Sequence, residues 1–395
     1  MEKAYGRHSL LYESLIIAME LTFFVNYLNH HQVLVADILY EKLGNQFCFV
    51  ATQSVDQSEM KGGEDYSTRP YCIIASKNSE SHEYALCLAR DSKTCVFGAN
   101  SLEYAIERAK YNSRGLSIER GERWLKRGMI NVLSPAFLKW RFCYQKYFQK
   151  ANFYRLCNSA YVSSDMRKVF AYDDRCYKWG YFTKVDRQLN YKKVHLESKY
   201  VNILWCARFI DWKHPELAIL LAQRLKDNKY NFHLDMIGEG NELNNIKSLV
   251  QSLNLVNQIS FLGNMPNEEV LVQMYKHDLF LFTSDRNEGW GAVANEAMSN
   301  GCVLVGADEI GSVPYLVSDY VNGMVFKSGD LDSLYEKVTY LIDNPIDRGR
   351  MSKAGMQSMR DVWCPENAAI SLLKLIESLQ NKEIPCILQG PCSKA

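Results

Sequence analysis

Residues 284–301 read SDRNEGWGAVANEAMSNG and lie between two short apolar runs, residues 279–283 and 302–306. This order predicts a strand, a loop, a short helix and a second strand. The loop glycines let the backbone approach a ligand closely, and the Asn-Gly pair at the end is a typical helix stop. Glu288 in the loop and Glu296 on the helix are eight residues apart. The two carboxylates could therefore bind two parts of one ligand.

The composition predicts a folded protein with two domains. A chain of 395 residues exceeds what one core usually spans, and 47% hydrophobic with 23% charged residues is ordinary for globular proteins. The net charge of +1 gives no global field for nucleic acid. Twelve scattered cysteines without a CxxC pair suit a reducing cytosol better than a zinc ribbon or a disulfide framework. We therefore expect a cytoplasmic protein that does not bind nucleic acid.

The ends of the chain differ from its middle. Residues 1–18 hold a short apolar run that Glu13 interrupts, which does not match a signal peptide, so we interpret them as an N-terminal extension. No run reaches the roughly 18–20 apolar residues that a membrane span needs. Residues 363–395 contain a last helix, which we expect to pack back on the first domain, followed by a tail.

Strands and helices alternate in two blocks that a polar and charged segment, residues 186–200, separates as a linker. In the first block, residues 19–185, strands are predicted at 21–25, 47–51, 71–75, 94–98, 116–119, 158–164 and 176–182. In the second block, residues 201–362, strands are predicted at 201–206, 232–237, 259–263, 279–283, 302–306 and 323–326. Helical patterns lie between them, so we expect an α/β protein with two Rossmann-like domains facing each other across a cleft.

Two cations follow the first strand of the second block. Arg208 and Lys213 lie between that strand and a helix that begins near Pro215. A helix N-terminus favours anions, and two added cations make a pocket suited to a diphosphate. On spacing alone, two ordinary loop cations remain an equal interpretation.

A glycine pair follows the next strand. Gly238-Glu239-Gly240 is similar to the start of a dinucleotide fingerprint, but Leu243 stands where the third glycine belongs. We interpret the pair as a tight turn near a ligand rather than a nicotinamide site.

Residues 121–164 form the basic part of the first block. Between Glu122 and Asp165 there is no acid, while eight lysines and arginines alternate with aromatic residues. One interpretation is a surface that rests on anionic lipid or on a lipid-linked anionic acceptor. The other is a solvated helix face above an aromatic core stripe.

Together, the spacing from Glu288 to Glu296 and the cations Arg208 and Lys213 resemble the E-x7-E motif and the phosphate-binding pair of retaining glycosyltransferase family 4. The resemblance extends over most of the chain, including residues 178–182 and 301–326. It implies a GT-B fold, with a nucleotide-sugar donor (a UDP- or GDP-sugar) on the second domain and the acceptor on the first. It also implies transfer with retention at the anomeric carbon, without a metal or another cofactor.

The resemblance also implies residue roles. Glu288 would contact the donor sugar, Glu296 the nucleotide ribose, and Arg208 and Lys213 the leaving diphosphate. Further donor-binding candidates are Asn287, Gly289, Trp290, Gly291 and Gly238.

The chain departs from the family pattern in the first domain. Where many members have a Gly-Gly loop, residues 26–32 form a polar loop, so Asn26, His30 or His31 could face the cleft, or the histidines could cap a helix at the surface. Where a family histidine is common, residues 117–123 offer Glu119, Glu122 and Arg123 as candidates. Tyr315 replaces a frequent glutamate, which leaves the contacts there open.

The leading hypothesis is a bacterial retaining glycosyltransferase. It would move a sugar to a glycan or lipid-linked acceptor in the biosynthesis of capsule, exopolysaccharide or lipopolysaccharide, in the cytoplasm or peripherally on the inner face of the cell membrane. The alternatives are a sugar-nucleotide epimerase of the same fold and a non-catalytic nucleotide-sugar-binding subunit of a polysaccharide assembly complex. A phosphorylase would need a pyridoxal-phosphate lysine, for which we find no pattern.

Overall fold

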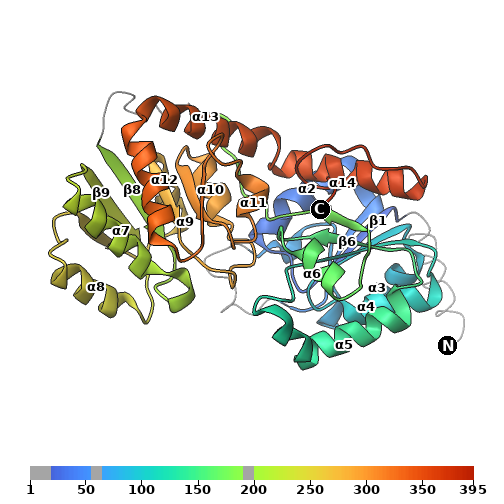
Figure 1. The fold of residues 1–395 in the computed structure, drawn as a ribbon. Helices are drawn as coiled ribbons and strands as arrows, with labels where there is room; N and C mark the ends of the chain where they lie inside the picture. The colour runs from blue at the N-terminus through green and yellow to red at the C-terminus, as the bar shows by residue number, and fades with distance from the viewer. Residues whose placement is uncertain (1–18, 55–64, 190–199) are drawn as a thin grey trace, which may run out of the picture. The chain divides into compact units, whose positions relative to one another are not determined.

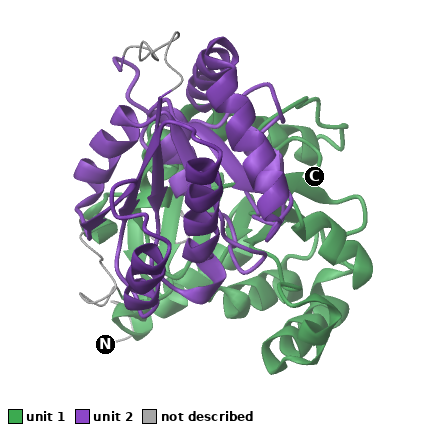
Figure 2. Cartoon of the chain, turned by 60° about the vertical axis from the view of Figure 1, so that its left-hand side comes forward, with its two compact units in different colours: residues 1–182, 365–395 green, residues 183–364 purple. Residues whose placement is uncertain are grey.

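The computed structural model describes residues 19–54, 65–189 and 200–395, which form two compact units (Figures 1 and 2). Unit 1 comprises the described residues up to Phe182 together with Pro365–Ala395, and unit 2 is Thr183–Cys364. The predicted extension, residues 1–18, and residues 190–199 of the predicted linker lie outside the described residues. Each unit holds one parallel sheet with helices, so the predicted α/β class with two Rossmann-like domains is confirmed.

Unit 1 contains a seven-stranded sheet in the order β3-β2-β1-β4-β5-β6-β7, with every neighbouring pair parallel. Its strands are β1 (Leu21–Val25), β2 (Phe47–Ala51), β3 (Cys72–Ile74), β4 (Thr94–Phe97), β5 (Leu116–Gly121), β6 (Phe153–Cys157) and β7 (Cys176–Lys178). Its helices are α2 (His30–Leu43), α3 (Ser79–Asp91), α4 (Leu102–Tyr111), α5 (Pro135–Cys143), α6 (Val162–Lys168) and α14 (Pro365–Gln380). The central strands β1, β2 and β4 are buried along their whole length, as expected of apolar runs covered on both faces.

Unit 2 contains a six-stranded sheet in the order β10-β9-β8-β11-β12-β13, also with parallel neighbours. Its strands are β8 (Val201–Cys206), β9 (Phe232–Ile237), β10 (Ile259–Gly263), β11 (Leu279–Phe282), β12 (Val303–Ala307) and β13 (Met324–Phe326). Its helices are α7 (Pro215–Asp227), α8 (Leu243–Ser252), α9 (Asn267–Lys276), α10 (Val293–Ser299), α11 (Val313–Leu316), α12 (Leu331–Asp343) and α13 (Pro345–Asp361).

The last helix belongs to unit 1 although unit 2 precedes it in the chain. In Figure 1 the red helix α14 lies beside the blue helix α2, and the two helices are in contact. The buried residues Leu372, Leu375 and Ile376 give α14 an apolar face. Unit 1 is therefore built from two separate parts of the sequence.

Three local predictions for unit 1 are wrong, and one of them is the strand at 176–182, because β7 ends at Lys178. Residues 158–164 were predicted as a strand, but the strand is Phe153–Cys157 and α6 begins at Val162. Arg155 obscured the strand because it interrupts the apolar run, yet it is only 2% exposed and pairs with Glu119 inside the unit. The polar loop predicted at residues 26–32 ends earlier, since α2 begins at His30 with Asn29 as its N-cap.

Candidate functional site

The sheet order of unit 2 reverses between β8 and β11, which lie side by side. In open parallel sheets, ligands bind beyond the carboxyl ends of the strands at such a reversal. The loop with Arg208 and Lys213 follows β8, and the loop with Glu288 follows β11. The fold therefore brings the predicted cations and the predicted carboxylate to the same edge of the sheet.

Lys213 and Glu288 form an ion pair between these two loops. Each side chain is only 12% exposed, so solvent screens the pair weakly. The hydroxyl of Ser284 donates to the same carboxylate oxygen of Glu288 at 3.1 Å, and the Lys213 ammonium lies 4.3 Å from the centre of the Trp212 ring. The carboxylate and the ammonium thus hold each other in a defined place.

Polar contacts at the ends of β8 and β11 fix the loop backbones. The Trp205 indole donates to the Thr283 hydroxyl at 2.9 Å, and that hydroxyl donates to the Lys213 carbonyl at 2.7 Å. The Asp285 amide donates to the Trp212 carbonyl at 3.1 Å. Sequence reasoning missed this positioning role of Thr283 and Asp285. The Thr283 hydroxyl directly after a buried strand is a sequence signal, whereas the backbone contact of Asp285 has none.

His214 links the same two loops and was also missed. Its Nδ1 lies 2.7 Å from Glu216 Oε1, and its Nε2 lies 3.7 Å from Asp285 Oδ2. The hydrogen bond to Glu216 raises the pKa of His214, and the charges of Glu216 and Asp285 act in the same direction. His214 adopts a left-handed backbone (φ 49°) directly before Pro215, the first residue of α7.

The glycine turn after β9 packs against the Arg208 loop. A Cβ on Gly238, whose φ is 131°, would lie 2.0 Å from the Ala207 carbonyl oxygen. The Phe209 amide donates to the Glu239 carbonyl at 2.9 Å. Gly238 therefore allows the turn after β9 to lie directly against the backbone of the Arg208 loop. The Arg208 side chain is exposed and has no ion-pair partner within the described chain.

Glu296 lies on α10, one turn from its N-terminus. The amide of Asn267 donates to it at 3.4 Å, and burial raises the pKa of Glu296 to about 7. Burial, and then the charge of Glu296, raise the pKa of Cys206 to about 12, while the charge of Lys213 opposes this shift. Glu296, Cys206 and Lys213 therefore lie within electrostatic reach of one another.

The residues around Glu288 shape its loop. Trp290 is only 1% exposed and donates to Asn295 Oδ1 at 2.9 Å, so it anchors the loop in the core of unit 2. Gly291 has a φ of 80°, and a Cβ there would lie 2.3 Å from the Phe282 ring. Asn287 folds back on Asp285, to which its backbone amide donates at 2.8 Å. Gly289, next to Glu288, is buried.

In unit 1, the candidates His30 and His31 occupy the first turn of α2, beyond the carboxyl end of β1. The His31 amide donates to the Asn29 side chain at 3.0 Å, and its ring stacks on Tyr181 with 5.3 Å between centroids. Burial lowers the pKa of His31 to about 3, so the ring is neutral near pH 7. The candidate Asn26 directly follows β1, and its carbonyl accepts a hydrogen bond from the Gln53 amide at 2.9 Å.

Glu119 is engaged inside unit 1. Its Oε1 accepts from the Trp140 indole at 2.9 Å, and its Oε2 accepts from the Tyr172 hydroxyl at 2.5 Å. The Arg155 guanidinium forms an ion pair with it at 2.6 Å. Glu119 therefore joins β5, α5 and β6, which is a structural role.

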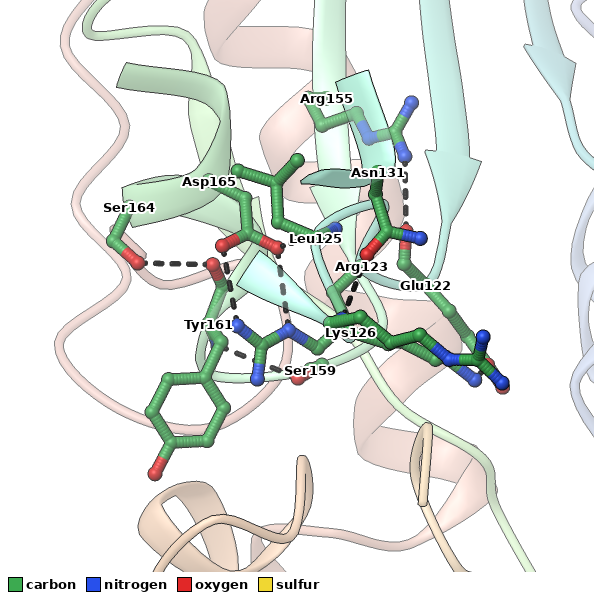
Figure 3. Close-up of polar contacts among 11 residues, drawn as sticks. Glu122, Arg123, Leu125, Lys126, Asn131, Arg155, Ser159, Tyr161, Ser164 and Asp165 are labelled. Carbon is green, nitrogen blue, oxygen red and sulfur yellow. Dashed lines mark hydrogen bonds and ion pairs between the residues drawn. The ribbon is translucent and has the colours of Figure 1, made fainter. Parts of the chain in front are cut away.

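Arg123 is also engaged, as Figure 3 shows. Its Nε and Nη2 donate to the two carboxylate oxygens of Asp165, each at 3.2 Å, and the Asp165 side chain is fully buried. The Leu125 amide donates to the same carboxylate at 3.2 Å, and the guanidinium lies 4.8 Å from the Tyr161 ring centre. This network ties the start of the basic segment 121–164 to α6.

Glu122 is more accessible than the neighbouring candidates Glu119 and Arg123. Its carboxylate accepts from the Tyr181 hydroxyl at 2.8 Å and from the Lys126 ammonium at 3.1 Å, and it remains 33% exposed. It also lines a cavity of about 690 Å³ at the carboxyl ends of β4 and β5. Further lining residues, which sequence analysis missed because they are far apart in the chain, are Gln53, Asn100, Trp124, Lys139 and Trp140.

The described residues contain no group of three or more His, Cys, Asp or Glu side chains placed to hold a metal ion. The same residues include no helix that is long and apolar enough to cross a membrane.

Two parallel-sheet units of this kind define the GT-B class of fold. The structure of HepE from Anabaena in complex with UDP matches with a TM-score of 0.66 and 14% identity, over 91% of this chain and 100% of that one. The apo form of WaaB, a lipopolysaccharide outer core galactosyltransferase, matches with a TM-score of 0.62 and 14% identity, over 89% and 99%. At 14% identity, the likeness to these two structures shows the fold alone.

Residues 186–358 match the family model of the glycosyl transferases group 1, which supports a glycosyltransferase of this superfamily. An uncharacterized glycosyltransferase of Methanocaldococcus jannaschii is 29% identical over 49% of this chain and 52% of its own length. The poly(glycerol-phosphate) alpha-glucosyltransferase of Bacillus subtilis is 29% identical over 49% of this chain and 29% of its own. The chain thus spans about half, or less, of the length of these curated relatives.

Proposed function

We propose that the chain is a retaining glycosyltransferase that moves a sugar from a UDP- or GDP-sugar to a glycan or lipid-linked acceptor in the cytoplasm, during cell-surface polysaccharide biosynthesis. The observation that carries this proposal is the Lys213–Glu288 pair, which lies with Arg208 where the strand order of unit 2 reverses. The E-x7-E spacing and the family match over residues 186–358 support it.

The donor diphosphate would bind to Arg208 and Lys213. The exposed Arg208 guanidinium is available for bidentate phosphate binding. The Lys213 ammonium has three donors, so it can keep its bond to Glu288 while donating to a phosphate oxygen. As the glycosidic bond breaks, the two cations would stabilise the negative charge that develops on the leaving diphosphate.

Glu288 and Glu296 would bind the two ends of the donor. Glu288, held by Lys213 and Ser284, would accept hydrogen bonds from the sugar hydroxyls and position the anomeric carbon. Glu296 would accept from the ribose hydroxyls. The buried Trp290 and the glycines beside it would keep the loop in the shape that presents Glu288.

The acceptor would occupy the cavity of about 690 Å³ in unit 1. Its lining combines the aromatic rings of Trp124 and Trp140 with charged side chains, including the accessible carboxylates of Glu103 and Glu122. Apolar surface with a few polar groups is typical of small-molecule sites. Because Glu119 and Arg123 bind other residues of unit 1, we assign both a structural role, Glu119 in the cavity wall and Arg123 beside it.

Next to this cavity, the basic segment presents an apolar surface. Phe137 and Trp140 on α5 are buried, while Leu138 and Phe142 on its outer side are 53% and 60% exposed. The preceding turn, Gly128–Leu133, adds Met129, Ile130 and Leu133 at 53%, 68% and 72% exposure. Arg127, Lys139 and Lys146 are exposed around them. We propose that this surface rests on an anionic membrane that carries the acceptor.

Calorimetry and a transfer assay test the proposed function. We expect UDP or GDP to bind the wild-type chain, about tenfold or more weaker binding in Lys213→Ala because a charge-assisted contact is lost, and unchanged binding in Lys276→Ala, an exposed lysine on α9. Glu288→Gln should keep nucleotide binding and abolish sugar transfer. Full activity in EDTA is expected.

Other outcomes identify the alternatives. An epimerised donor without net release of nucleoside diphosphate would indicate the epimerase. Nucleotide-sugar binding without turnover on any glycan or lipid-linked acceptor would indicate the non-catalytic subunit. Nucleotide binding that is equal in wild type and Lys213→Ala would remove Lys213 from the phosphate site.

Co-sedimentation with vesicles tests the membrane surface. Binding should require anionic lipid, weaken with salt, and fall in Ile130→Ser/Leu133→Ser. The matched control is Val256→Ser/Val272→Ser, which removes two valines of unit 2 that are 60% and 51% exposed. Equal binding of both double variants would contradict the proposal.

A further inference from the structure

We infer that unit 1 carries a second ligand site, for a soluble polyanion such as a phosphate-rich polymer, at the amino-terminal edge of its sheet. A cavity of about 970 Å³ lies there, lined by residues that precede β4, β5, β6 and β7 and by the segment after α14. In a parallel sheet this edge is opposite the carboxyl ends, where the acceptor cavity lies. The site is therefore separate from that cavity and does not depend on the proposed transfer.

The lining is strongly positive. Six cations contribute to it against two carboxylates, Asp174 and Glu383, a local excess of four positive charges in a chain whose total net charge is +1. A concave surface lined by one sign of charge concentrates ligands of the opposite sign. The cations are Lys93, Arg114, Lys150, Arg175, Lys382 and Lys394.

Three of these cations have structural partners. Lys93 forms an ion pair with Glu20 at 2.9 Å, and the Arg175 guanidinium donates to the Phe153 carbonyl at 3.3 Å. The Lys394 ammonium donates to the Asp174 carbonyl. These contacts hold the wall of the cavity in place and give three of the six cations a structural role.

The other three cations make no structural contact of this kind within the described residues. Arg114, Lys150 and Lys382 are exposed, and no side-chain partner is found for them among the described residues. They come from segments far apart in the sequence: the turn before β5, the turn before β6 and the segment after α14. Cations that outnumber the carboxylates of one cavity repel one another, and a bound anion would offset this repulsion.

The size and lining of the cavity indicate the class of ligand. About 970 Å³ is far more than one phosphate group needs, so several anionic groups can be held at once. Tyr154 and Tyr177, whose ring centres lie 6.3 Å apart, add flat apolar surface beside the cations. A flexible chain with closely spaced phosphate groups fits these features.

Calorimetry of the full chain with inorganic tripolyphosphate tests the site. The variant Arg114→Gln/Lys150→Gln/Lys382→Gln should bind about tenfold or more weakly than wild type, because three charge-assisted contacts are lost. The control Lys42→Gln/Lys77→Gln/Lys353→Gln removes the same charge from exposed positions elsewhere and should bind like wild type. Equal thermal unfolding of both triple variants would show that each is folded.

Every other result overturns the inference. Equal binding by the two triple variants would mean general charge attraction. Loss of binding in Lys213→Ala alone would place tripolyphosphate at the donor site. Binding to anionic vesicles that is lost in the first triple variant, with tripolyphosphate binding unchanged, would mean that a lipid surface and not a soluble polyanion occupies the cavity.

Discussion

Glu296→Gln should make the protein more stable at pH 8 and weaken nucleotide binding. In the folded chain burial moves the pKa of Glu296 from 4.5 to about 7. Below pH 4.5 the carboxyl is neutral in both the folded and the unfolded state, so it does not affect stability. As the pH rises from 4.5 through 7, the unfolded chain loses the proton first, so the free energy of unfolding falls.

The structure sets the size of this effect. A pKa that moves from 4.5 to about 7 corresponds to at most about 3 kcal/mol at pH 8. Solvent reaches part of the Glu296 side chain, so we expect a gain of about 1–2 kcal/mol for glutamine. Glutamine is neutral at every pH and keeps one acceptor, so the gain should vanish near pH 4.5.

Thermal and urea unfolding between pH 4.5 and 8 would measure the gain, and calorimetry with UDP or GDP would measure binding. We expect Glu296→Gln to bind the nucleotide about tenfold more weakly, because glutamine keeps only one of the two side-chain oxygens that can accept a hydrogen bond. The matched control is Glu336→Gln, an exposed glutamate on α12. If Glu296→Gln and Glu336→Gln show the same dependence of stability on pH, the reasoning is wrong.

Three further predictions concern the loops around Lys213. Lys213→Met and Glu288→Gln should each lower the free energy of unfolding by about 2–4 kcal/mol, because each change leaves the other charge unpaired. The double variant should therefore lose less stability than the sum of the two single variants. Additive losses in urea unfolding would contradict the pairing. His214 has a raised pKa, so its contribution of about 0.5–1 kcal/mol should be complete below pH 6.5 and disappear as the pH rises through the folded-state pKa. A melting temperature whose pH dependence is unchanged in His214→Gln would rule this out. Gly238→Ala should destabilise unit 2 by about 1–3 kcal/mol and weaken nucleotide binding, because its Cβ would meet the Ala207 carbonyl; wild-type melting and affinity would refute the clash.

Much of the fold was predictable because the strands are continuous apolar runs. Leu21–Val25, Phe47–Ala51 and Val201–Cys206 were predicted with their observed bounds. The failures have physical causes. Arg155 interrupts the apolar pattern of β6, and its pairing with Glu119 depends on a strand distant in sequence. The polar His30 and His31 concealed the first turn of α2, although Asn29 was the available N-cap signal.

The candidate site, like the fold, was predictable only in part. Glu288 and Glu296 could be located from the sequence because they lie on one loop and the helix that follows it. Arg208 and Lys213 could be connected with them only through resemblance, since the adjacency of β8 and β11 is a property of the sheet. The acceptor cavity of about 690 Å³ was not predictable because Asn100, Glu122 and Trp140 meet only in the folded unit.

The return of α14 to unit 1 affects the order in which the protein can assemble on the ribosome. The strands of unit 1 and all of unit 2 are synthesised before Pro365–Gln380, so α2 lacks its partner helix until then. Unit 1 should consequently reach its full stability only after α14 has left the exit tunnel. The segment Thr183–Cys364, in contrast, contains its whole sheet and is the natural choice for expression as a separate fragment.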